Sequence, residues 1–136
     1  MEQNRSLGLL SIARKGGNLE LGEESVGSAC REGRARLVLL ASDAAENSCR
    51  RAANAAGSTN VIRVPFTREE LGAALGRMSC ASAALTDVRL AQAFVRALNR
   101  PEDAAVLADL GERVRRVEQR RKEERAHEYN VKHGKK

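Results

Sequence analysis

Residues 19–43 read LELGEESVGSACREGRARLVLLASD, in which two short apolar runs flank a segment with helical spacing. The first run, Leu19-Glu20-Leu21, alternates apolar and acidic side chains and then meets Gly22, which predicts a short half-buried strand and a sharp turn. Apolar side chains recur at helical intervals up to Gly33, and this predicts a helix over residues 23–32. Residues 37–41 form an unbroken apolar run, typical of a strand that is covered on both faces.

The rest of the chain up to residue 99 continues this alternation. A helix ending near Arg14 precedes the segment, and short apolar runs at residues 61–64 and 81–86 predict two more strands. Two helices should begin at capping boxes, one formed by Asp43 and Glu46 and one formed by Thr67 and Glu70, and another helix covers residues 88–99. The apolar stripe expected on the helix after Asp43 comprises Ala45, Cys49, Ala52, Ala53 and Ala56. Alternating strands and helices predict an α/β fold, a three-layer α/β/α sandwich with a small mixed four-stranded sheet.

Residues 100–136 form a separate region after the domain expected at residues 1–99. Apolar side chains there follow one another at spacings of three, four and three, at Leu107, Leu110, Val114 and Val117. This short seam predicts a helix that packs on the domain or on a partner, including a second copy of the chain. Beyond Val117 the charged stretch runs from Glu118 to Glu128, and the chain should then fray over residues 131–136. This C-terminal helical tail should therefore be solvated or disordered unless bound.

Length, charge and cysteine content narrow the range of functions that the protein could have. The chain has 136 residues, enough for one core, and a formal net charge of +6, which favours an anionic partner such as RNA. An arginine-rich surface that only keeps the protein soluble is the alternative interpretation. Three cysteines without a CxxC pair indicate reduced thiols and a cytoplasmic protein, and no segment reaches the length of a membrane span.

No catalytic constellation is present in the sequence. Both histidines, His127 and His133, lie in the charged tail, which excludes a histidine-dependent site in the core. Glu23 and Glu24 occupy adjacent helix positions that point about 100° apart, so they are more typical of first-turn acids than of an acid/base pair. No glycine is followed by the Lys and Ser or Thr of a phosphate-binding loop. We therefore expect no enzyme activity, no cofactor and no metal site.

Glycine turns that lead into helices remain as candidate binding features. The turns at Gly22 and Asp43 and the loop of residues 77–80 would form one patch if they share one end of the sheet. Free backbone N–H groups at a helix start suit phosphate oxygens. Cations close to these turns in sequence are Arg14, Lys15, Arg31, Arg34 and Arg36.

The sequence resembles the L-seven-Ae family of large-subunit ribosomal proteins and kink-turn RNA binders over residues 5–99. The resemblance is carried by residues 7–16, 21–26, 32–43 and 70–76, in matching order and spacing. Within the family the chain is most similar to the YlxQ-like bacterial branch. The resemblance implies the same α/β/α sandwich and a non-enzymatic, ribosome-associated protein that binds structured RNA, with other ribosomal proteins as further partners.

The resemblance also implies where RNA would bind. The family's contacts come from the turn into the second helix and from the loop before the last strand. With the neighbouring cations, the implied RNA-binding residues are Gly22, Glu23, Glu24, Ser25, Ser28, Arg31, Arg34, Arg77, Met78 and Ser79. The kink-turn pattern has Asn at the position of Glu24 and Lys near Ser28, so here an acid replaces an amide that binds guanine. The alternative is a protein-interaction or oligomerisation module that has lost specific kink-turn binding.

Overall fold

The computed structural model describes residues 2–132, in which helices and short strands alternate. In chain order they are α1 (Glu2–Lys15), β1 (Leu19–Leu21), α2 (Glu23–Arg31), β2 (Leu37–Leu40), α3 (Glu46–Ala56), β3 (Asn60–Arg63), α4 (Arg68–Leu75), β4 (Ser82–Leu85), α5 (Val88–Leu98), a 3₁₀ turn at Pro101–Asp103 and α6 (Ala104–Lys132). Each expected strand is present, within one or two residues of its expected limits. This confirms the alternation that the sequence predicts.

The four strands form one mixed sheet in the order β1-β4-β2-β3. β4 pairs antiparallel with both β1 and β2, whereas β3 runs parallel to β2. The sheet therefore has two different ends. At one end, which we call the Gly22 end, β1, β2 and β3 finish and β4 begins; at the opposite end β4 finishes and the other three strands begin.

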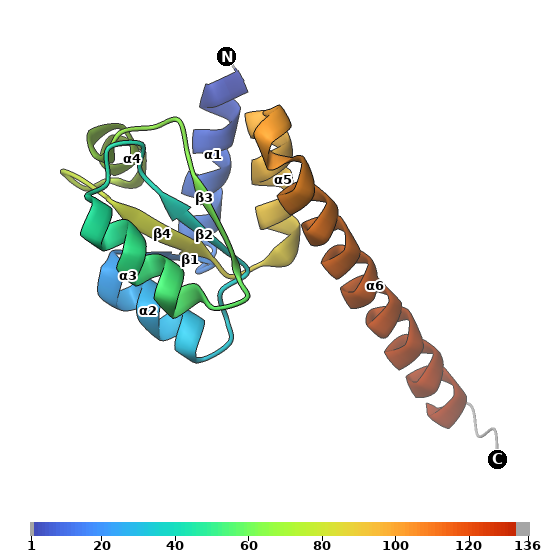
Figure 1. The fold of residues 1–136 in the computed structure, drawn as a ribbon. Helices are drawn as coiled ribbons and strands as arrows, with labels where there is room; N and C mark the ends of the chain where they lie inside the picture. The colour runs from blue at the N-terminus through green and yellow to red at the C-terminus, as the bar shows by residue number, and fades with distance from the viewer. Residues whose placement is uncertain (1, 133–136) are drawn as a thin grey trace.

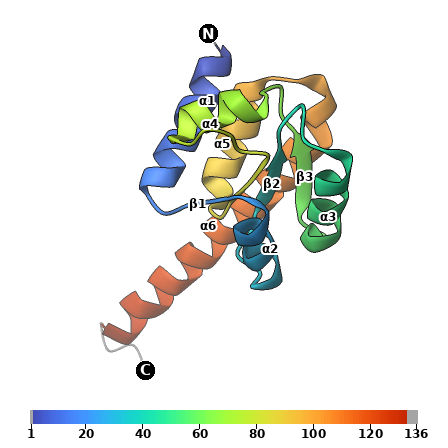
Figure 2. The same cartoon turned by 90° about the vertical axis from the view of Figure 1, so that its left-hand side faces the viewer.

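Helices cover both faces of this sheet. α1, α4, α5 and the first half of α6 bury the larger core on one face, around Leu10, Leu37 and Phe94. α2 and α3 cover the other face over a smaller core that contains Val26, Val38 and Ala52. Figures 1 and 2 show these layers on either side of the sheet. The α/β/α sandwich with a mixed four-stranded sheet is thus confirmed.

The helix starts agree with the sequence in one case and differ in another. Thr67 and Glu70 form both bonds of a capping box, with Glu70 N–H donating to Thr67 Oγ1 at 3.1 Å and Thr67 N–H donating to Glu70 Oε1 at 2.9 Å. The capping box expected from Asp43 is wrong, because α3 begins at Glu46 after Ala45 and has no side-chain cap. Asp43 instead accepts a hydrogen bond from the Arg68 N–H at 2.8 Å, at the start of α4.

The apolar stripe expected on α3 is narrower in the structure. Ala52 and Ala56 are buried and Cys49 is half-buried, whereas Ala45 and Ala53 are exposed. The later helix start explains the exposure of Ala45, which precedes the first turn rather than lying within it. α3 therefore contacts α2 through a few small side chains.

α6 has two parts with different surroundings. Leu110 and Val114 are buried in the larger core, and Leu107 and Val117 pack against it, so the seam binds the chain's own domain through α5. Every side chain from Glu118 to Lys132 is exposed, and the backbone is helical over these residues. The helix extends away from the domain (Figure 1). The fraying expected at residues 133–136 lies outside the described residues.

Candidate nucleic-acid interface

The turn at Gly22 connects β1 directly to α2. Gly22 has φ 91°, a conformation that side-chain-bearing residues rarely adopt, and its N–H donates to the Ser82 carbonyl at 3.0 Å. This bond fastens the turn to the first residue of β4. No side chain caps α2, so the N–H groups of its first turn point outward at the positive end of the helix dipole.

The loop after α4 lies beside this turn. α4 ends at Gly76, which has φ 74°, and the Arg77 N–H donates back to the Gly72 carbonyl at 2.8 Å. A Cβ placed on Gly22 would lie 4.0 Å from Nη1 of Arg77, so the guanidinium of this loop adjoins the glycine turn. The two segments that the family resemblance implies are thus adjacent, although 55 positions separate them in the sequence.

Close backbone packing holds the loop in place. A Cβ on Gly72 would lie 2.7 Å from Cα of Ser79 and 2.8 Å from the Arg77 carbonyl oxygen, distances that real Cβ atoms do not show. Only a glycine at position 72 therefore allows the backbone of residues 77–79 to pass this close to α4. The side chain of Met78, directed away from the core, is 94% exposed.

Arg14 adds a second cation from the end of α1. Its Nη1 lies 3.3 Å from the position of a Cβ on Gly76. Burial raises the pKa of the Cys80 thiol, and the positive charges of Arg77 and, more weakly, Arg14 act in the opposite direction, which is consistent with both guanidinium groups lying near this thiol. We call Arg14, Gly22, Arg77, Met78 and Ser79 the glycine-turn surface. The sequence singled out Arg14 only as a nearby cation.

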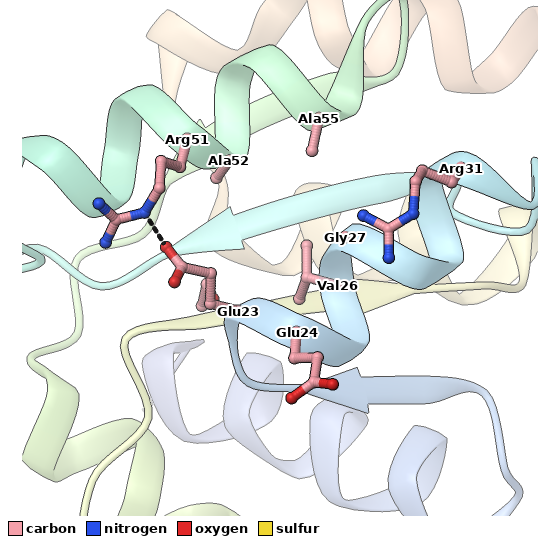
Figure 3. A pocket seen from close by; sticks show the side chains of 9 residues that line it. Glu23, Glu24, Val26, Gly27, Arg31, Arg51, Ala52 and Ala55 are labelled. Atoms are coloured by element: carbon pink, nitrogen blue, oxygen red, sulfur yellow. Dashed lines mark hydrogen bonds and ion pairs between the residues drawn. The ribbon is translucent and has the colours of Figure 1, made fainter.

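The two acids at the start of α2 have different surroundings. Glu23 forms an ion pair with Arg51 of α3 at 2.6 Å, across one end of a shallow groove between α2 and α3 (Figure 3). Glu24 is exposed and points away from Arg51 in the same view. Of these two acids, only Glu23 has its charge compensated by an ion pair within residues 2–132.

The remaining residues expected in the site lie further along α2 or beyond it. Ser25 and Ser28 are half-buried, and Ser28 Oγ accepts a 3.3 Å hydrogen bond from Arg31. Arg31 is in the last turn of α2 and folds back toward Gly27, at the other end of the groove from Glu23 (Figure 3). The structure thus places Ser25 in the first turn of α2, next to Gly22, whereas Ser28 and Arg31 lie together toward the other end of the helix.

Arg34 and Arg36 lie at the opposite end of the sheet. Gly33 stops α2, and Arg34 then pairs with Glu32 at 2.7 Å and with Glu20 at 3.1 Å, which raises the pKa of its guanidinium. Arg36 precedes β2, and its N–H bonds to the Leu85 carbonyl at 2.7 Å. Closeness in sequence to Gly22 is misleading here, because α2 carries the chain to the other end of the sheet.

Within residues 2–132, no group of three or more His, Cys, Asp or Glu side chains could hold a metal ion. Across those residues, no helix combines the length and apolar character needed to cross a membrane. Cys30, Cys49 and Cys80 are free thiols.

The mixed sheet, its two helical layers and the glycine turn beside the Arg77 loop define an α/β protein with a three-layer sandwich. The chain belongs to the Ribosomal protein L7Ae/L30e/S12e/Gadd45 family, which it matches over residues 4–94. A search of the curated proteins gives no match. The family assignment expected from the sequence is confirmed at this level.

Two solved structures illustrate the likeness of fold. A protein of unknown function from Bacillus halodurans C is 28% identical, with a TM-score of 0.64 over 70% of this chain and 97% of that one. The Giardia lamblia 15.5kD RNA binding protein is 16% identical, with a TM-score of 0.57 over 74% of this chain and 88% of that one. At this identity the second comparison supports the fold alone.

Proposed function

We propose that this protein is a non-enzymatic RNA-binding protein that docks on structured RNA through the glycine-turn surface. The observation that carries the proposal is the position of Arg77, whose guanidinium lies beside the uncapped start of α2. A phosphate at this point would meet both backbone N–H donors and a planar cation. The family match and the net charge of +6 support the same conclusion.

We further propose that the RNA is ribosomal, that the chain belongs to the YlxQ-like branch of the family, and that it acts in the cytoplasm near other ribosomal proteins. Support comes from the ribosomal family match and from the three free thiols, which are usual in a reducing compartment. The domain limits of 1–99 and 100–136 are part of this proposal, with α6 anchored on the domain by Leu110 and Val114.

The mode of recognition should favour RNA backbone over base edges. A carboxylate at Glu24 cannot donate to the acceptor atoms of guanine, and Ser28 supplies no cation. Backbone N–H groups, Arg14 and Arg77 remain, and all of them suit phosphate oxygens. We therefore propose that binding depends strongly on salt and weakly on the bases of a kink-turn.

The direct test is a titration of the protein against a kink-turn RNA and against the same RNA with its tandem G·A pairs broken, at several salt concentrations. We expect Arg77→Ala to weaken binding to both RNAs and to lower the slope of log affinity against log salt by about one. Arg96→Ala, which removes an exposed arginine from the last turn of α5, is the matched control and should have little effect. Equal affinity for Arg77→Ala and Arg96→Ala would show that RNA does not bind at the glycine-turn surface.

The protein-interaction alternative loses its main support in the fold. Its candidate seam, Leu107 to Val117, is already occupied by α5 and the core of the same chain. We therefore expect light scattering to report a monomer for the full chain. A dimer would show that the chain associates through other residues and would favour the interaction module.

A further inference from the structure

A second group of arginines gathers at the end of the sheet opposite Gly22. Arg36, from the segment before β2, lines a shallow surface pocket together with Arg113, Arg116 and Arg120 of α6, above Val88 and Val117. The three arginines of α6 follow at spacings of three and four, so they share one face of the helix. We call these four arginines the second arginine cluster.

The charges of this cluster are only partly compensated within the protein. Arg113 pairs with Asp109 at 2.9 Å, and one guanidinium N–H of Arg36 donates to the Gly33 carbonyl at 2.9 Å. Neither Arg116 nor Arg120 forms an ion pair with any residue of the described chain, 2–132. The hydrogen bonds that Asp109 and Glu112 accept lower the pKa of both carboxyls, and the charge of nearby Arg116 contributes to the same effect, so the positive charge of the cluster is reduced but not cancelled. Like charges one turn apart weaken a helix, and an anionic ligand would lower the repulsion that remains.

The position of the cluster separates it from the glycine-turn surface. The Arg36 N–H bonds to Leu85 at the last residue of β4, whereas the Gly22 N–H bonds to Ser82 at its first residue. The three rises from Ser82 to Leu85 span roughly 10 Å, so a single phosphate held at one end of the sheet does not reach the other. Any anion at the second arginine cluster is thus a separate contact.

We propose that the second arginine cluster binds the phosphate backbone of a second segment of the RNA that occupies the glycine-turn surface. This inference rests on the proposed RNA-binding function. Arginine forks match phosphate oxygens in a bidentate way, and a pocket lined by four of them suits a phosphodiester. RNA is favoured over an acidic protein because the same sheet already presents phosphate-binding groups at its other end, and one extended RNA can reach both.

The test compares two double variants of the full chain. Arg116→Ala with Arg120→Ala removes two members of the cluster, whereas Arg121→Ala with Arg125→Ala removes the same charge from other faces of α6, in a stretch where the side chains are exposed. Alanine favours helix, so neither pair should unfold α6, and circular dichroism checks this. The probes are a kink-turn RNA with one flanking duplex lengthened and the same RNA with that duplex cut back to the kink.

We expect the cluster variant to bind the lengthened RNA several-fold more weakly than its control and with a salt slope smaller by about two. On the shortened RNA the two variants should bind alike, because only the glycine-turn surface is then occupied. Equal affinities and slopes on the lengthened RNA would overturn the second contact while leaving RNA binding at Gly22 intact. If the unmodified protein binds neither RNA, the proposed function fails as well, and an acidic protein becomes the partner to test.

Discussion

Gly72 shows how one residue without a functional group can determine a binding surface. The loop of residues 77–79 crosses α4 so closely that a single added carbon would meet backbone atoms of Arg77 and Ser79 at 2.7–2.8 Å. Backbone atoms cannot rotate away as a flexible side chain can. The position of Arg77 beside Gly22 therefore depends on the missing side chain of Gly72.

We predict that Gly72→Ala lowers the free energy of unfolding by about 1–3 kcal/mol, because the loop must move off the helix. RNA affinity should fall as well, since Arg77 moves with the loop. Urea denaturation measures the first effect, and RNA titration the second. Gly8→Ala is the control, because nothing lies within 4 Å of its Cβ position in α1, and there alanine should stabilise by up to about 1 kcal/mol. Similar effects at both glycines would contradict the close approach.

Asp43 shows a carboxylate whose partner cannot be found by local sequence spacing. Its Oδ1 accepts the Arg68 N–H at 2.8 Å, and its Oδ2 lies 3.6 Å from the Arg68 guanidinium. The backbone hydrogen bond from Arg68, with the nearby guanidinium, holds the pKa of Asp43 below its usual value. The ionised form is therefore favoured in the folded protein, and it stabilises the start of α4.

We predict that Asp43→Ala destabilises the protein at neutral pH and that the difference shrinks in acid. The pKa of Asp43 is lower in the folded state than the value of about 3.9 in an unfolded chain. Its contribution is thus fully present above about pH 4 and is lost as the pH falls through the folded pKa. Thermal unfolding at a series of pH values measures this. Asp43→Asn keeps a carbonyl acceptor, so its loss at neutral pH should be smaller than that of Asp43→Ala, and it should shrink in acid in the same way because both variants lack the titrating carboxyl; an equal loss for Asp43→Ala at every pH would exclude a role for the charge.

At the scale of elements, the first half of α6 belongs to the core and the second half does not. Leu110 is completely buried and Val114 is 7% exposed, whereas Val131 is 66% exposed. Short helices are marginal alone in water, so the projecting turns rely on the buried first half to begin the helix. The seam of apolar residues thus anchors the charged part of α6.

We predict that Leu110→Ala lowers the free energy of unfolding by about 2–5 kcal/mol, because it leaves a cavity between α5, α6 and the sheet. Val131→Ala removes an equally apolar but exposed side chain and should change stability by less than about 0.5 kcal/mol. Chemical denaturation of the two variants measures the contrast. A mild effect of Leu110→Ala would mean that α6 does not pack on the domain in solution.

Most elements could be predicted from the sequence because their signals are local. The capping box at Thr67, the glycine stop at Gly33 and the apolar run of β2 each lie within a few residues of the feature they specify. The start of α3 could not be predicted from the sequence, because Asp43 has the spacing to Glu46 of a capping box but bonds to a residue 25 positions away. The surface against which the apolar seam of α6 packs could not be predicted either, since the spacing of apolar residues does not reveal what covers them.

For the whole molecule, the binding surface could be predicted only in part. The resemblance led to Gly22 and Arg77, which lie together, but Arg34 was included by closeness in sequence and lies at the opposite end of the sheet. The contact of Arg14 with Gly76 and the role of Gly72 follow from packing between α1, α4 and the loop. Such packing between distant segments cannot be predicted from the spacing of residues in the sequence.

The start of α2 differs from the kink-turn pattern at two positions, Glu24 and Ser28, and substitutions can restore the residue types of that pattern. We predict that Glu24→Asn with Ser28→Lys raises affinity for the intact kink-turn more than for the RNA with broken G·A pairs, because an amide and a cation are restored beside Gly22. Competition binding with both RNAs measures this preference. Glu102→Asn with Ser58→Lys changes the net charge equally at exposed positions elsewhere and should not discriminate. A gain without discrimination would indicate charge alone.

The bond between Gly22 and Ser82 has a consequence for the order in which the chain is made. The glycine turn is synthesised early, but the strand that fixes it and the arginine that completes the surface come 55 to 60 residues later. During translation, the emerging N-terminal half therefore lacks the assembled glycine-turn surface that we propose binds RNA. This surface is completed late in synthesis, once β4 can insert between β1 and β2.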